Sequence, residues 1–527
     1  MTDRPLEQAG AAPAAVPPGI GAPAEFALLV SVFVVAACGL VYELIAGALA
    51  SYLLGDSVLQ FSTVIGAYLF AMGIGSYLSR YLDSQLPAHF LRIELLVGLI
   101  GGLMPAALFL LHAWAPAPFR LLLYGLVIVI GTLVGLEIPL VMRIMKRGYA
   151  LKDLVSQVLT FDYLGALAVS LAFPLVLAPR LGMIRTGLLF GLMNAAVALW
   201  ALWVFRAELP ARRAHAAWSA LVLAALGIAF VGADLVTRWG EDHFYGQRIV
   251  LAESSPYQRI VITDSRGQIR LFLNGNLQFS SRDEHRYHEA LVHPAMSAHP
   301  APRSVLILGG GDGLAAREIL RYPDVERVTL VDLDARVTGL FRDDPRLAAL
   351  NEGSLRSPRL RVVNEDAFRW LEDDTASYDV IVIDLPDPTN YSLGKLYTTA
   401  FYSLVEQRLA GSGLIVVQTT SPLYARQSFW TVARTIEAVG LTVHPYHALV
   451  PSFGDWGYLI AAHRPYRPPA RFPAALEGRL RFLTPELLPG LFVFPADMQR
   501  VPAEVNRLDN QVLVRIFERE WGRVAPE

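Results

Sequence analysis

Long apolar runs, separated by short polar stretches, fill the first half of the chain. They cover roughly residues 26–54, 58–80, 91–112, 120–145, 157–179, 183–206 and 216–236. Each is about as long as the ~20 residues with which a helix crosses the apolar part of a bilayer. The pattern predicts a transmembrane domain of about seven helices over residues 25–240. The Ala/Pro/Gly-rich residues 1–24 before it are expected to be a disordered tail.

From about residue 240 the pattern changes to short strands, turns and helices. Residues 247–263 and 268–273 are typical of strands, with a turn at Gly267, which predicts a small antiparallel β domain over 241–300. Residues 301–465 alternate apolar strands with helical segments, as in a mostly parallel sheet. After the strands that begin at Val305 and Val328, the expected strands are Leu360–Val363, Tyr378–Asp384, Gly413–Gln418, Leu441–His444 and Trp456–Ala462. Residues 466–527 are a Pro/Arg-rich C-terminal extension, helical toward Trp521, for which the pattern indicates no role.

One strand in the second half ends in a run of glycines. The apolar run that begins at Val305 leads into Gly309-Gly310-Gly311-Asp312-Gly313, and a helical pattern follows. Glycines let a backbone approach a ligand closely. A second strand, Val328–Asp332, ends in an acid, which at this place typically holds a ribose. Because Asp312 would repel a pyrophosphate, we interpret the turn as a site for a nucleoside and a cation. The plain alternative is a β–α turn without a ligand.

Polar side chains follow the ends of five successive predicted strands. Because parallel strands end at one edge of a sheet, these side chains should meet there. We expect a concave, strongly negative pocket that suits a polycation with a nucleoside. The alternative is that these acids are solvent-exposed and share their position by chance. The residues are Asp312, Asp332, Glu365 with Asp366, Asp384 with Asp387, and Gln418.

Composition narrows the class of protein. Hydrophobic residues make up 54% and charged residues 17%, whereas soluble domains average roughly a quarter charged. A net charge of −2 gives no case for nucleic-acid binding. Cys38 is the only cysteine, which excludes an intrachain disulfide and a cysteine metal site. No His/Asp/Glu cluster has metal-ligand spacing, so no metal is predicted.

Three acids lie within the predicted spans: Glu43, Glu137 and Asp162. Acids in lipid usually face the interior of a helix bundle. They could form a path or sensor for a cationic solute, or they could simply make hydrogen bonds between helices in protonated form. We also expect small residues such as Gly66, Gly73 and Gly75 to allow close helix packing.

Over roughly residues 250–465 the chain resembles the polyamine aminopropyltransferases, the spermidine synthase family. The resemblance rests on many short pieces in the same order, and the N-terminal half resembles the membrane-embedded bacterial form. The pieces are Ser255-Pro256-Tyr257-Gln258, Asp283-Glu284, Tyr287-His288-Glu289, Gly309-Gly310-Gly311-Asp312-Gly313, Val331-Asp332-Leu333-Asp334, Glu365-Asp366-Ala367, Tyr378 to Asp384 with Asp387-Pro388, Leu396-Tyr397 and Trp456-Gly457-Tyr458.

The resemblance implies a fold and a reaction. The fold class is a multi-pass α-helical membrane domain followed by an α/β Rossmann-like, methyltransferase-type catalytic domain over 301–465 with a small N-terminal β-sheet. The reaction transfers an aminopropyl group from decarboxylated S-adenosylmethionine to putrescine or a related amine, giving spermidine and methylthioadenosine. The donor is a co-substrate, so no cofactor is expected. The partners are polyamine and nucleoside substrates and the lipid bilayer, without nucleic acid; a homo-oligomer is left open.

The resemblance also implies roles for individual residues, according to their positions in the matching motifs. The resemblance implies that the methylthioadenosine part of the donor contacts Gln258, Asp332, Asp366 and Ala367. It implies an amine channel lined by His288, Asp312 and Asp387, with Asp384 as the proton acceptor.

The sequence also departs from the family pattern. Pro386 stands between the two acids after the fourth strand, Asn274 replaces an acid, and the segment Thr389–Lys395 is atypical and adds a cation. These departures bear on the acceptor amine more than on the donor.

Two other functions remain open. An S-adenosylmethionine-dependent methyltransferase would share the sheet, but Asp312 would repel the carboxylate of the intact donor. A polyamine-binding membrane sensor or transporter without catalysis would not need the Asp384/Asp387 pair.

Two arguments about sidedness conflict. Basic residues after the fourth and sixth runs place the N-terminus inside the cell, so seven spans would place the C-terminal domain outside. The donor, however, is made inside cells. Giving the chemistry more weight, we predict a cell-membrane protein with a cytoplasmic catalytic domain.

Overall fold

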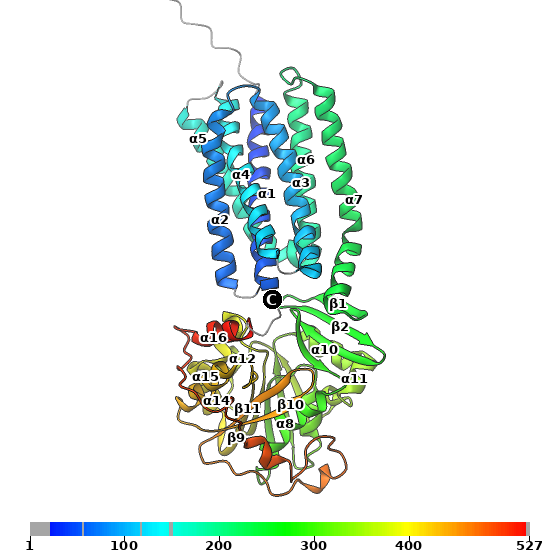
Figure 1. The fold of residues 1–527 in the computed structure, drawn as a ribbon, viewed down its shortest axis with the longest axis vertical. Helices are drawn as coiled ribbons and strands as arrows, with labels where there is room; N and C mark the ends of the chain where they lie inside the picture. Colours follow the sequence, from blue (N-terminus) through cyan, green and yellow to red (C-terminus); the bar gives the residue numbers. More distant parts are fainter. Residues whose placement is uncertain (1–21, 55–56, 116–117, 147–150, 523–527) are drawn as a thin grey trace, which may run out of the picture. The chain divides into compact units, whose positions relative to one another are not determined.

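The computed structural model describes residues 22–54, 57–115, 118–146 and 151–522 (Figure 1). The chain forms two compact units. The helical unit runs to Gly240, and the α/β unit comprises the chain from Glu241 onward.

Seven long helices make up the described part of the helical unit. In chain order they are α1 (Ala22–Leu54), α2 (Ser57–Leu78), α3 (Leu86–Trp114), α4 (Phe119–Met145), α5 (Leu151–Ala172), α6 (Ala178–Val204) and α7 (Arg212–Tyr245), the last of which continues past Gly240. Six helical stretches of the described residues are long and apolar enough to cross a membrane.

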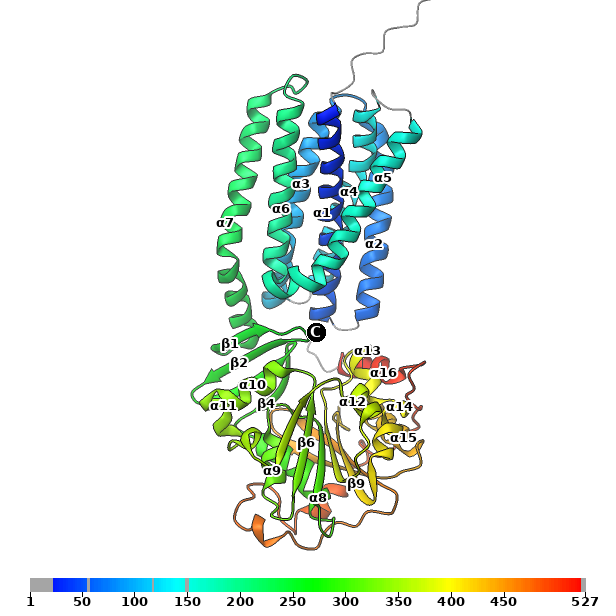
Figure 2. The same cartoon turned by 180° about the vertical axis from the view of Figure 1, so that it is seen from behind.

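The longest of these stretches, Lys152–Val204, contains two of the predicted runs. A straight helix of its 53 residues would be about 80 Å long, more than twice the ~30 Å of a bilayer core. A π-helical segment, Phe173–Leu177, and a non-helical Gly182 with φ 73° interrupt it. Figure 2 accordingly shows α5 and α6 as separate rods.

Glycines bring some of these helices close together. A Cβ on Gly75 of α2 would overlap the carbonyl oxygen of Thr132 on α4, so this glycine does allow close packing. The same expectation is wrong for Gly66 and Gly73, where a Cβ would meet no atom within 4 Å. The α3–α6 contact, which the sequence did not indicate, also depends on glycine: a Cβ on Gly98 would lie 2.8 Å from the carbonyl oxygen of Gly191.

The α/β unit begins with a four-stranded antiparallel sheet in the order β1-β2-β3-β4. Its strands are β1 (Ile249–Ser254), β2 (Arg259–Ser265), β3 (Gln268–Leu273) and β4 (Asn276–Ser280).

A seven-stranded sheet follows, in the order β10-β11-β9-β8-β5-β6-β7. The five strands β5 to β9 are parallel, and β11 is antiparallel to both of its neighbours. The strands are β5 (Ser304–Gly309), β6 (Arg327–Asp332), β7 (Leu360–Asn364), β8 (Tyr378–Asp384), β9 (Leu409–Thr419), β10 (Thr442–Val450) and β11 (Gly454–Ala462).

Helices cover both faces of this sheet. One face packs on α8 (Glu284–Met296), α9 (Leu314–Leu320), α10 (Ala335–Asp343) and α11 (Pro345–Leu350); the other packs on α12 (Ala367–Asp373), α14 (Thr399–Gln407), α15 (Arg426–Glu437) and α16 (Val512–Trp521). Side chains along β5 alternate between two apolar clusters, with Val305 and Ile307 in one and Leu306 and Leu308 in the other. A strand buried on both faces must be apolar throughout, which explains its unbroken hydrophobic pattern.

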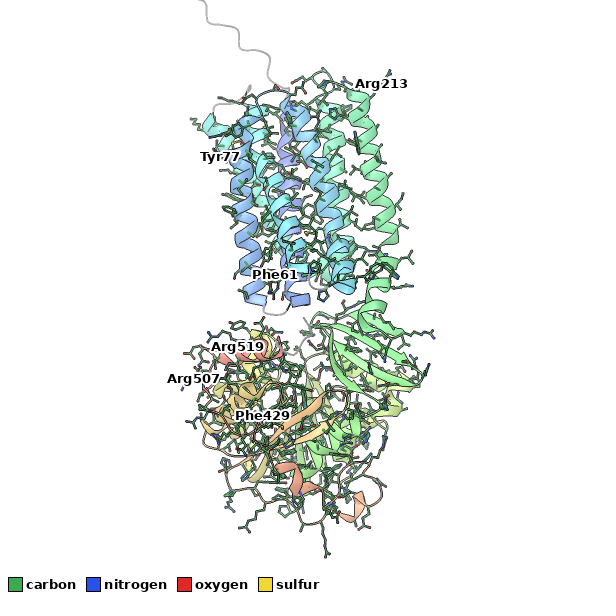
Figure 3. All side chains as sticks on the ribbon, in the orientation of Figure 1. Phe61, Tyr77, Arg213, Phe429, Arg507 and Arg519 are labelled. Carbon is green, nitrogen blue, oxygen red and sulfur yellow. The ribbon has the colours of Figure 1, made fainter. Side chains whose placement is uncertain are left out.

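The C-terminal extension completes both clusters. Leu476, Leu483 and Leu488 join the first, and Leu513 of α16 joins the second. In Figure 3, Phe429 of the second cluster lies inside the α/β unit, whereas Arg507 and Arg519 of the extension lie at its surface. The extension is therefore part of the fold of the α/β unit.

Candidate active site

The polar residues predicted at the strand ends do lie at one edge of the sheet. Strand register places Gly309 of β5 beside Asp384 of β8, and Asp332 of β6 beside Asn364 of β7. The chain changes direction across the sheet between β7 and β8, which leaves β5 and β8 as neighbours. In open α/β sheets ligands bind at this switch point, outside the carboxyl ends of the strands.

The Gly-rich turn packs directly against the end of β8. Gly309 has φ 86° and Gly310 has φ 64°, which are left-handed conformations that favour glycine. The backbone N–H of Gly310 donates to the carbonyl of Asp384 at 3.1 Å, and a Cβ on Gly309 would overlap that same oxygen. The turn therefore depends on glycine for its contact with β8.

Backbone amides hold the carboxylates of the turn and of β6. Asp332 accepts from the N–H of Gly311 at 3.0 Å and from that of Asp334 at 2.9 Å. Asp312 accepts from the N–H of Leu314 at 2.9 Å. Burial raises the pKa of Asp332 and of Asp312 to about 6 in each case, although these hydrogen bonds oppose the rise.

Asp384 is held by helix α8. The Tyr287 hydroxyl donates to its carboxylate at 2.6 Å. Burial raises the pKa of Asp384, while the charge of His288 and the hydrogen bond from Tyr287 oppose the rise. A buried carboxyl with a raised pKa can exchange a proton closer to neutral pH than a solvated one.

His288 belongs to a buried ion network. Its Nδ1 lies 2.9 Å from Glu284, and Arg317 donates to the same carboxylate at 2.9 and 3.1 Å. Burial would raise the pKa of Glu284, but His288 and Arg317 lower it to about 2. Burial would lower the pKa of His288, but Glu284 above all raises it to about 9. His288 is therefore a cation at neutral pH, and its charge acts on Asp312 and Asp384.

Asp387 has an unpaired carboxylate oxygen. Its Oδ1 is buried and has no hydrogen-bond partner among the residues that the structure describes. Burial raises the pKa of Asp387 to about 7, opposed by the side chain of Gln418. The indole N–H of Trp456 donates to Gln418 at 3.1 Å, and Gln418 itself donates to the carbonyl of Leu385. The end of β9 thus meets the loop after β8.

The remaining predicted residues have partners of their own. Gln258 donates to Asp334 at 2.9 Å, and Ser255 donates to the same oxygen at 2.6 Å. Asp366 caps α12 by accepting from the N–H of Phe368 at 2.9 Å.

Asp366 also pairs with the cation of the atypical segment. Its carboxylate lies 2.5 Å from the Lys395 ammonium. Burial alone would raise the pKa of Asp366, but the contact with Lys395 lowers it. Ala367, the first residue of α12, is buried.

The structure thus brings Asp312, Asp332, Asp384 and His288 into one electrostatic cluster. Gln258 and Asp366 instead contact Asp334 and Lys395. Sequence reasoning assigned no role to Tyr287, Glu284, Asp334 or Lys395. Three of these were visible only as neighbours within the matched motifs, and Lys395 only as an added cation. Among the residues that the structure describes, no group of three or more His, Cys, Asp or Glu side chains could hold a metal ion.

Comparisons with known proteins agree with this geometry. A family model described as "Spermine/spermidine synthase domain" matches residues 284–469. "Polyamine aminopropyltransferase 2" of Ralstonia nicotianae is 58% identical over 503 residues, covering 94% of this chain and 98% of that protein. "Polyamine aminopropyltransferase" of Leptospira interrogans is 51% identical over 504 residues, covering 95% of this chain and 99% of that protein. The protein of the same name from Oceanobacillus iheyensis is 42% identical over 496 residues, covering 93% and 96%.

Proposed function

The chain belongs to the polyamine aminopropyltransferase family, and on that premise we propose that it transfers the aminopropyl group of decarboxylated S-adenosylmethionine to putrescine or a related diamine. The products are spermidine, or the corresponding longer amine, and methylthioadenosine. Three half-buried carboxyls with raised pKa values, at the ends of β5 and β8, carry this proposal: Asp312, Asp384 and Asp387.

Asp384 is the proton acceptor in this proposal. The neutral amine nitrogen attacks the methylene carbon beside the sulfonium, a C–N bond forms, and the C–S bond breaks with its electron pair going to sulfur. The new ammonium then gives its proton to Asp384. Its position at the switch point and its hydrogen bond from Tyr287 support this role, because a general base must be held in one orientation to act.

Asp387 and Asp312 bind the acceptor amine. The unpaired oxygen of Asp387 is the kind of group that an ammonium satisfies, since a buried carboxylate is costly without a charged partner. Asp312 lies within electrostatic range of Asp384 and His288. Holding the far ammonium of a diamine aligns its other nitrogen for attack.

Asp332, Gln258, Asp366 and Ala367 bind the nucleoside part of the donor. The carboxylate of Asp332, fixed by two backbone amides, suits the ribose hydroxyls. The ion pair with Lys395 keeps Asp366 ionised, and the hydrogen bond to Asp334 orients Gln258.

We also propose that the helical unit lies in the cell membrane and that the α/β unit is cytoplasmic, where the donor is made. The apolar helical stretches support the first part. A reporter fused after Glu527 tests the second. Green fluorescent protein should fluoresce there, whereas active alkaline phosphatase with a dark fluorescent fusion would reverse the orientation.

The reaction is tested with the purified full chain in detergent, decarboxylated S-adenosylmethionine and a panel of diamines, with mass spectrometry of the products. We expect one methylthioadenosine for each aminopropylated amine. A parallel reaction with intact S-adenosylmethionine separates the main alternative: a methylated product there, without aminopropyl transfer in the first reaction, would mean a methyltransferase. Amine binding without any methylthioadenosine release would mean a binding protein.

A further inference from the structure

The helical unit contains a cavity lined by side chains of α1, α2, α4 and α5. Its volume is about 200 Å³. Most of its lining residues are aliphatic, and three are carboxylic acids from three different helices: Glu43 of α1, Glu137 of α4 and Asp162 of α5. None of the described residues that line it is a lysine, arginine or histidine. The cavity therefore has acidic groups without a basic counterpart.

Glu137 is the residue that points to a ligand. Its side chain is only 2% exposed, and its Oε1 has no hydrogen-bond partner among the described residues. Glu94 of α3 is also fully buried, and neither of its carboxylate oxygens has a hydrogen-bond partner in the part of the chain that the structure describes. Glu137 interacts electrostatically with both Glu94 and Asp162. Unpaired carboxyls in an apolar interior are costly, and proteins keep them where they meet a cation or a proton.

The spacing of the acids favours an extended cation over a metal ion. No three of the described acids converge as a metal site requires, although three of them line this one cavity. A divalent cation needs several oxygens within about 2.6 Å of one point. An aliphatic polyammonium ion instead carries separated charges joined by methylenes, and therefore needs separated carboxylates joined by an apolar wall.

The rest of the lining fits such an ion. Val35, Met72 and Ile138 provide apolar surface for methylenes. Tyr68 lies against the cavity with its hydroxyl fixed by the carbonyl of Gly39 at 2.8 Å, which leaves its ring as a surface for an ammonium.

We infer that the helical unit has its own binding site for an aliphatic di- or polyammonium ion, with Glu43, Glu137 and Asp162 as its counter-charges. The inference rests on the cavity alone and not on the reaction proposed for the α/β unit, so either one can fail without the other.

The test is equilibrium binding of radiolabelled spermidine to the full chain in lipid nanodiscs, with catalytic turnover measured on the same preparations. We expect the wild-type chain to bind two spermidines, of which one occupies the helical unit and the other rests on the reaction proposed for the α/β unit. Glu137→Gln should weaken one of the two by at least about tenfold, because a buried charge pair is lost. Turnover should stay within about twofold of the wild type.

Matched variants separate charge, shape and folding. Asp162→Asn should weaken the same site, whereas Asp153→Asn, an exposed acid on the same helix α5, makes the same charge change outside the cavity and should leave both sites intact. Ala36→Leu should block the site without changing any charge, because Ala36 lines the cavity. Should Glu137→Gln fail to give a monodisperse protein, Glu43→Gln and Ala36→Leu carry the test.

Three outcomes would overturn the inference. The first is that Glu137→Gln, Asp162→Asn and Ala36→Leu each bind spermidine at both sites as the wild type does. The acids would then serve only in contacts between helices. The second is a single wild-type site that Asp387→Asn removes. The third is displacement by propylamine or sodium as effective as displacement by putrescine.

Discussion

Tyr287→Phe is the most direct test of the proton acceptor. The variant removes one hydroxyl, which donates to Asp384 at 2.6 Å, and leaves the ring in place. A hydrogen bond to an ionised carboxylate contributes roughly 1.5–3 kcal/mol, and about 1.4 kcal/mol corresponds to one pKa unit. Because this bond favours the ionised form, its loss should raise the pKa of Asp384 further.

The assay is the pH dependence of kcat/KM for the acceptor amine at saturating donor. The acidic limb of the profile should move to higher pH. Because 1.5–3 kcal/mol corresponds to a factor of roughly 10 to 100, the variant should be slower than the wild type by about that factor below the limb. At alkaline pH its rate should approach that of the wild type, since Asp384 is then ionised in both proteins. The amine itself titrates identically in the two reactions, so the difference reports on the enzyme.

Tyr446→Phe is the control. Tyr446 is also buried and also contacts α8, but its hydroxyl donates to the carbonyl of Ala290 at 2.8 Å and not to a carboxylate. This variant should leave the limb in place. If Tyr287→Phe lowers the rate by the same factor at every pH, Tyr287 has a purely structural role and Asp384 is not the titrating base.

Three other changes probe the surrounding groups. Asp384→Asn should lower turnover by ~10²–10⁴-fold while methylthioadenosine still binds in equilibrium dialysis; near-normal turnover would refute its role. Asp312→Asn should raise the KM of the acceptor more than that of the donor, and the reverse pattern would exchange the assigned roles. The pKa of His288 in the folded protein is about 9, above its ordinary 6.5, so protonated His288 stabilises the folded state by roughly 3 kcal/mol. This stabilisation is complete below pH 6.5 and is lost as the pH rises through 9. The Tm of the wild type should therefore fall across that range, and Glu284→Gln should largely abolish the fall; an equal fall in both would show that the ion pair with Glu284 does not hold the proton.

The interior strands could be predicted because burial alone decides their sequence. Tyr378–Asp384 was predicted with the bounds that β8 has, since this strand is covered on both faces. β10 and β11 were predicted too short, as 441–444 and 456–462, because Pro445, His447 and Asp455 interrupt the apolar pattern and the pairing between the two strands extends them. β4 was missed because its residues are mixed in polarity and only its pairing with β3 defines it.

The candidate site also divides into features that the local sequence predicts and features that depend on how distant segments pack. The sequence shows which strands end in acids, and because parallel strands end at one edge of a sheet, it also predicts that these acids gather there. The hydrogen-bond partners of these acids could not be predicted. Tyr287 and Asp384 are far apart in sequence, and only the packing of α8 brings them together. Lys395 was visible as a cation in an atypical segment, but its pairing with Asp366 depends on how that segment folds back.

The contact between α8 and the C-terminal extension bears on the order in which the protein can mature during synthesis. Glu289, next to His288, accepts from the backbone N–H groups of Arg481, Phe482 and Leu483 at 2.7, 2.9 and 2.9 Å. A ribosome makes α8 long before it makes these three residues. Until they emerge, the buried carboxylate of Glu289 lacks its donors and the apolar cluster under α8 lacks the leucines of the extension. We therefore expect the nascent enzyme to stay inactive until translation is nearly finished, so that catalysis begins only in a chain whose helical unit has already been synthesised in full.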